Sequence, residues 1–65
     1  MLMAKKKSTN PWPAKLKAIR ARLDISQREA AERIGTVLRT WQNWEYGRTR
    51  PNPMLAKLID LTFPE

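Results

Sequence analysis

Two short helical patterns joined by one glycine constrain most strongly what this chain can fold into. The first opens at Ser26, three residues before Glu29, a spacing at which each side chain can satisfy the free backbone N–H of the other. Gly35 ends the pattern, because glycine adopts the left-handed conformation of a helix C-terminus at little cost. Between them lies a narrow stripe of small apolar residues, which are Ala30, Ala31 and Ile34. The sequence therefore predicts a short helix that a neighbouring helix can approach closely.

The second pattern separates apolar from mostly polar residues at helical spacing. Its apolar side is formed by Val37, Trp41 and Trp44. Its other side carries Leu38, Arg39, Gln42, Asn43 and Tyr46. We interpret the two tryptophans as core residues, although stacking on single-stranded bases is the alternative use of aromatic side chains in a basic protein. A helix that turns arginine, glutamine and asparagine outward is typical of one presented to the major groove of DNA.

Residues 15–62 resemble the Cro/C1-type helix-turn-helix family of phage and bacterial repressors. The residues that carry the resemblance are Ser26-Gln27, Ala31, Gly35, Glu45-Tyr46-Gly47 and Pro51. The resemblance implies an all-α, compact domain of four or five helices that binds double-stranded DNA. The chain departs from the family at Ala30, where a larger aliphatic residue is usual, and at Val37, where a serine normally caps the recognition helix. We therefore expect Thr36 to cap that helix instead, one residue early.

Composition limits the remaining possibilities. The chain of 65 residues is long enough for one domain with a small core, and its net charge of +7 favours a polyanionic partner. It contains no cysteine and no histidine, and its carboxylates are scattered among basic residues. We therefore expect no disulfide, no zinc site, no cofactor and no enzyme activity. The opening residues 1–4 are too short for a signal or membrane segment, so we expect a cytoplasmic protein that is not membrane-bound. We also expect no separate oligomerisation domain of the kind that larger repressors of the resembled family carry.

Residues 1–13 are predicted to form a flexible basic arm before a helix-turn-helix domain over residues 14–65. The arm contains Lys5, Lys6 and Lys7. This arm either contacts DNA, along the phosphates or in a minor groove, or forms a solvated tail, and the sequence leaves both interpretations open. Trp12, between two prolines, is expected to pack against the base of the first helix.

The first helix is predicted from about Pro13 or Ala14 to Leu23. Its apolar face comprises Leu16, Ile19 and Leu23. Arg20 lies beside this face, so its charge requires a partner. The family resemblance implies an ion pair between Arg20 and Glu45, which would tie the first helix to the recognition helix.

A last helix is predicted from the N-cap Asn52 and the following Pro53 to about Thr62. Its expected core-facing residues are Leu55, Leu58, Ile59 and Thr62. Three apolar residues remain outside that stripe, and we interpret them as a homodimer interface: Met54, Leu61 and Phe63. The alternative is that Met54 and Phe63 fold back to cap a small core.

The residues expected to contact base edges are Leu38, Arg39, Gln42 and Asn43. Arg39 suits guanine, Gln42 or Asn43 suits adenine, and Leu38 suits a thymine methyl group. Thr40, Arg48 and Arg50 are expected to contact the DNA backbone. The resemblance implies the same role for Gln27, at the start of the second helix.

The function expected from these features is repression of transcription, of the protein's own operon, by a homodimer bound to a palindromic operator. The string Arg39-Thr40-Trp41-Gln42-Asn43-Trp44-Glu45 also resembles small regulators encoded beside anti-CRISPR genes and antitoxins of toxin–antitoxin modules. The first alternative is thus an antitoxin that neutralises a protein toxin. The second is a protein that binds nucleic acid without sequence preference.

Overall fold

The computed structural model describes residues 10–64, and these residues form four helices without a strand. The helices are α1 (Trp12–Leu23), α2 (Gln27–Ile34), α3 (Leu38–Tyr46) and α4 (Pro53–Thr62). The all-α fold expected from the sequence is confirmed. Lys5, Lys6 and Lys7 lie outside the described residues, so their proposed phosphate contacts stay a prediction.

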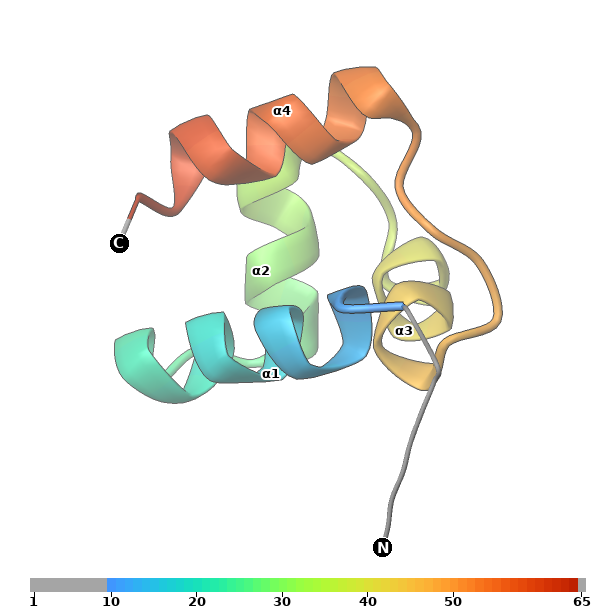
Figure 1. The fold of residues 1–65 in the computed structure, drawn as a ribbon. Coiled ribbons are helices and arrows are strands. Elements are labelled where there is room, and N and C mark those ends of the chain that lie inside the picture. The colour runs from blue at the N-terminus through green and yellow to red at the C-terminus, as the bar shows by residue number, and fades with distance from the viewer. Residues whose placement is uncertain (1–9, 65) are drawn as a thin grey trace, which may run out of the picture.

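Figure 1 shows α1 and α4 on opposite sides of the domain, with α2 running between them. α2 packs against both α3 and α4, and α3 also packs against α1. α3 lies beside the N-terminal half of α1, away from the C-terminal end of α4 (Figure 1). The recognition helix expected from the sequence is thus held by the first two helices on one side of the domain.

The helix ends follow local chemistry at most positions. The Ser26 hydroxyl accepts a hydrogen bond from the backbone N–H of Glu29 at 3.0 Å, and the Asn52 side chain accepts from that of Leu55 at 2.8 Å. Gly35 adopts a φ of 88° where α2 ends, as predicted. The N-terminal boundary of α1 differs from the prediction, because the helix begins at Trp12. Residues 12 and 13, which we assigned to the arm, therefore belong to α1.

The prediction that Thr36 caps α3 is wrong. The N-cap is Val37, which offers no side-chain hydrogen bond. Thr36 is already used by the preceding helix: its backbone N–H donates to the carbonyl of Ala31 at 3.0 Å, while that of Gly35 donates to Glu32 at 3.1 Å. This pair of bonds is the Schellman motif that closes α2. Val37 is also 64% exposed, and so does not lie on the inner face of α3 as expected.

The core is centred on Trp41, which is fully buried. Its ring centroid lies 6.0 Å from that of Trp44 and 6.2 Å from that of Phe63, whose ring meets it edge-on. The core roles of both tryptophans are confirmed. The remaining buried apolar residues come from the other helices: Leu16, Ile19, Ala30, Ala31, Ile34 and Ile59.

Phe63 corrects the predicted dimer interface. It is only 4% exposed, so it closes the core and is not part of an exposed patch. Met54 and Leu61 remain 80% and 70% exposed, and Leu58, predicted to face the core, is also exposed. Leu23, which was predicted to lie on the apolar face of the first helix, is exposed as well. The fold-back alternative is therefore right for Phe63 and wrong for Met54.

None of the four helices within residues 10–64 has the length and apolar character needed to cross a membrane.

Candidate nucleic-acid interface

The residues predicted to contact bases all lie on α3. Arg39 is exposed, whereas Leu38, Gln42 and Asn43 are partly buried. Their side of the helix is opposite the one that places Trp41 and Trp44 in the core. Thr40 is also partly buried on α3. The structure thus gathers the candidate base-reading side chains on one helix, with Arg39 the most accessible of them.

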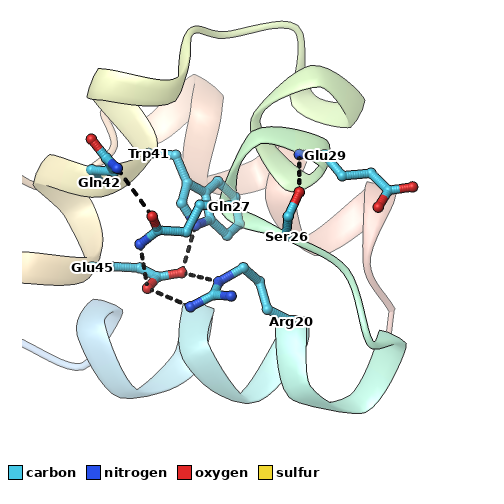
Figure 2. Close-up of polar contacts among 7 residues, drawn as sticks. All are labelled: Arg20, Ser26, Gln27, Glu29, Trp41, Gln42 and Glu45. Atoms are coloured by element: carbon cyan, nitrogen blue, oxygen red, sulfur yellow. Dashed lines mark hydrogen bonds and ion pairs between the residues drawn. The ribbon is translucent and has the colours of Figure 1, made fainter.

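A buried carboxylate holds α3 against the rest of the domain. Glu45 is only 2% exposed, and its Oε2 accepts hydrogen bonds from the Nε of Arg20 at 2.5 Å and from the indole N–H of Trp41 at 2.6 Å. Its Oε1 accepts from the Nη2 of Arg20 at 3.0 Å and from the Nε2 of Gln27 at 3.1 Å. Figure 2 shows these four bonds converging on one carboxylate. Glu45 therefore connects α1, α2 and α3 through side-chain contacts.

The ion pair implied by the family resemblance is thus present, and it has two additional donors. The contributions of Trp41 and Gln27 were missed. Trp41 lies four residues before Glu45 on α3, a spacing that makes their side chains neighbours, whereas the contact of Gln27 with Glu45 joins two helices and has no local signal. A carboxylate inside an apolar core requires several donors to offset its loss of hydration. The two bonds from Arg20 fix the guanidinium in one orientation, so this contact sets the relative position of α1 and α3.

The hydrogen bonds to Glu45 also decide its protonation state. Burial alone would raise the pKa of Glu45, but the hydrogen bonds from Arg20, Trp41 and Gln27 outweigh it and lower the pKa below the ordinary value of 4.5. The hydrogen bond to Glu45 in turn raises the pKa of Arg20. Glu45 is therefore a carboxylate and Arg20 a cation at neutral pH.

We expect the lowered pKa of Glu45 to make folding stability depend on pH. A carboxyl group with a lower pKa in the folded state stabilises the fold above its unfolded pKa, about 4.5, and loses that contribution as the pH falls through the folded value. Urea unfolding of the wild type and of Glu45→Gln at a series of pH values tests this. The free energy of unfolding should fall more steeply below pH 4.5 in the wild type. Parallel curves would contradict the assignment.

Gln27 has a different position from the one expected of a phosphate-binding side chain. Its Nε2 donates to Glu45, and its Oε1 accepts a hydrogen bond from the Nε2 of Gln42 at 3.1 Å. This chain of amides links the buried carboxylate to the outer part of α3 (Figure 2). Gln27 therefore orients the amide of Gln42, a role that sequence spacing does not reveal. Its phosphate contact stays a prediction.

The segment after α3 carries Arg48 and Arg50, which are both exposed. Gly47 ends the helix with a φ of 80°, and the backbone N–H of Arg48 then donates to the carbonyl of Asn43 at 2.9 Å. Pro51, at the far end of the segment, is buried. The two arginines are thus held beside the C-terminal end of α3, within a short segment anchored at both ends.

A helix-turn-helix family model matches residues 16–64. The chain belongs to this family. The matched range includes Arg20, both helices of the motif and α4. This confirms the Cro/C1-type resemblance, and α2 and α3 are the two helices that give the helix-turn-helix its name.

Among curated proteins, the chain is similar to the type II methyltransferase M.MspI of a Moraxella species. The two are 46% identical over 41 residues, which cover 63% of this chain and 10% of the methyltransferase. The aligned stretch of 41 residues is longer than the part of the chain outside the family match, which is residues 1–15 and residue 65. It must therefore overlap the matched helix-turn-helix domain. The chain thus spans about a tenth of that relative's length. No solved structure matches the chain.

Proposed function

We propose that this helix-turn-helix protein binds a specific sequence of double-stranded DNA as a homodimer and represses transcription, including that of its own operon. The observation that carries the proposal is α3, whose inner face is fixed in the core while its outer face presents Arg39, Gln42 and Asn43. A net charge of +7 supports a polyanionic partner. The cytoplasm of a bacterial host is the proposed location.

The proposed contacts follow from the chemistry of base edges. A guanidinium can donate two hydrogen bonds to guanine, so Arg39 is assigned to a guanine. Asn43 is assigned to adenine, which presents one donor and one acceptor in the major groove. Gln42 uses one amide N–H on Gln27, which leaves its second N–H and its carbonyl oxygen for a base. Thr40, Arg48 and Arg50 are assigned to phosphates beside these bases.

The proposed homodimer rests on α4. Met54, Leu58 and Leu61 are spaced four and three residues apart, so they form one exposed apolar stripe along the helix. A second copy would cover this stripe by twofold symmetry, since both copies carry the same surface. Two recognition helices would then face half-sites with centres about 34 Å apart, which requires an inverted repeat in the operator.

We propose no enzyme activity for this chain. The curated relative is a methyltransferase, but this chain spans only a tenth of it, so no methyl transfer is assigned here. Within residues 10–64, no group of three or more histidine, cysteine or carboxylate side chains is placed to hold a metal ion. Regulation by DNA binding is the function that the described surface supports best.

Replacing Arg39 with alanine is expected to remove about 1–3 kcal/mol of discrimination at one base pair in each half-site. The target is first selected by the wild-type protein from a pool of random duplexes. Affinities are then measured by fluorescence anisotropy for the selected duplex and for each single-base variant of it. The Arg39→Ala protein should bind all duplexes that differ at one base-pair position with equal affinity, while it still discriminates between bases at the other positions.

Arg48→Ala is the matched comparator, because it removes the same charge from beside the same helix. We expect it to weaken all duplexes alike and to lower the slope of log affinity against log salt by about one. A wild-type protein with equal affinity for unrelated duplexes would overturn the proposal in favour of the non-specific alternative. A stable complex with the product of a neighbouring gene, together with no selected duplex, would favour the antitoxin alternative.

A further inference from the structure

Val37 is an apolar residue where the structure of the helix favours a polar one. It is the N-cap of α3, with extended backbone angles of −98° and 158° and no side-chain hydrogen bond to the helix. The N-caps of α2 and α4, by contrast, are Ser26 and Asn52, and each accepts a bond from a backbone N–H. Valine is among the poorest N-cap residues, so Val37 makes α3 less stable than serine would.

Core packing does not explain why a valine occupies this position. The side chain of Val37 is 64% exposed, and it belongs to neither the buried core nor the apolar residues packed against it. The next residue, Leu38, is better covered, and Arg39 after it is exposed. A residue that is unfavourable for its helix and adds nothing to core packing is a candidate for a role in binding. The role must be one that a short, branched apolar side chain can perform.

The position of Val37 indicates what it meets. A recognition helix contacts base edges with its N-terminal residues. The major groove presents one strongly apolar group on its base edges, the C5-methyl group of thymine. Contact between this methyl group and a valine removes both from water, whereas a serine would leave its hydroxyl against an apolar surface.

We propose that Val37 is a specificity-determining residue that contacts the methyl group of a thymine beside the N-terminal end of α3. This inference rests on the proposed function and adds to it a second type of readout, by apolar contact, next to the hydrogen bonds assigned to Arg39. It also moves the thymine contact from Leu38, which the sequence favoured, to its more exposed neighbour. The loss of a capping hydroxyl is thus a cost in helix stability that accompanies selectivity for thymine.

The test removes the methyl group without changing base pairing. In the duplex selected by the wild-type protein, each thymine is replaced in turn by deoxyuridine, and affinity is measured by fluorescence anisotropy. At one position in each half-site we expect affinity to fall about fourfold, the effect of one methyl-sized group buried. In the Val37→Ala variant, deoxyuridine at that position should have no further effect, while its effects at other positions persist. Leu38→Ala is the matched control and should keep the wild-type response.

A second variant separates binding from folding. Val37→Ser restores a capping hydroxyl, so we expect a higher melting temperature than that of the wild type together with weaker binding to the thymine duplex. A residue with a purely structural role would move stability and affinity in the same direction.

The outcomes distinguish this inference from the function on which it rests. A wild-type protein that selects no sequence would overturn both. If the protein is selective but Val37→Ala leaves every deoxyuridine effect unchanged, or if Leu38→Ala alone removes one, Val37 does not contact the methyl group. Equal weakening of thymine and deoxyuridine duplexes by Val37→Ala would likewise overturn the inference, because it would indicate contact with the sugar or phosphate.

Discussion

Replacing Glu45 with alanine is expected to lower the free energy of unfolding by about 3 kcal/mol, near the lower end of the 3–5 kcal/mol typical of breaking a buried ion pair. The substitution leaves the guanidinium of Arg20 and the indole N–H of Trp41 without their acceptor. We place the loss at the lower end because the Arg20 side chain is 26% exposed and water can partly rehydrate it. Urea unfolding followed by tryptophan fluorescence measures the change.

Two variants make this measurement interpretable. Glu45→Gln keeps one acceptor oxygen and is expected to be destabilised less than Glu45→Ala. Glu29→Ala removes an exposed glutamate whose carboxylate lies 3.6 Å from Arg33, and such a surface pair contributes about 0.5 kcal/mol or less. A loss for Glu45→Ala as small as that for Glu29→Ala would show that the buried carboxylate does not hold the helices together.

Replacing Met54 and Leu61 with glutamine is expected to yield a folded monomer that binds a full operator about a hundredfold more weakly. Both side chains are exposed in the monomer, so their loss should not disturb the core. The effect on binding is large because two linked recognition helices gain about 10²–10⁴ in affinity over one. Glutamine is preferred to a charged residue, since a change of charge would itself alter DNA affinity. Sedimentation and circular dichroism report assembly and folding.

Leu23→Gln provides the control for this double variant, because Leu23 is a partly exposed leucine on α1, outside the α4 stripe. It should leave assembly and affinity unchanged. Phe63 is not used as a test position, since it is buried against Trp41 and its replacement would damage the core. A wild-type protein that sediments as a monomer, or a double variant that stays dimeric with full affinity, would contradict the proposed interface.

The sequence predicted well those features that depend on neighbours along the chain. Ser26 and Asn52 cap their helices because each acceptor lies within three residues of its donor. Gly35 ends α2 for a similarly local reason, its positive φ. The tryptophans of α3 were placed in the core by their spacing alone. Helical spacing on α1 indicated that the charge of Arg20 needs a partner, and the family resemblance identified Glu45 as that partner.

The errors at Phe63 and Leu58 concern residues whose surroundings come from distant parts of the chain. Phe63 follows the last helical residue, so helical spacing could not show that it packs against Trp41. Leu58 fits the apolar pattern of α4, yet it remains 36% exposed. Thr36 was expected to cap α3, but the end of α2 requires its backbone N–H. For Phe63 and Leu58 the sequence pattern lacked information on tertiary packing, whereas the error at Thr36 is local, because its partner Ala31 lies only five residues earlier.

The two faces of α3 have different consequences for how this protein can change over time. The residues of the inner face cannot be exchanged without disturbing the core, since Trp41, Trp44 and Glu45 are all buried. On the outer face, the side chains of Arg39 and Asn43 make no hydrogen bond to another part of the described chain, so exchanging them should alter stability little. Under the proposed function, substitutions at Arg39 and Asn43 would therefore change the preferred DNA sequence without disturbing the buried residues of α3. Gln42 is the exception, because replacing it would also remove the hydrogen bond to Gln27.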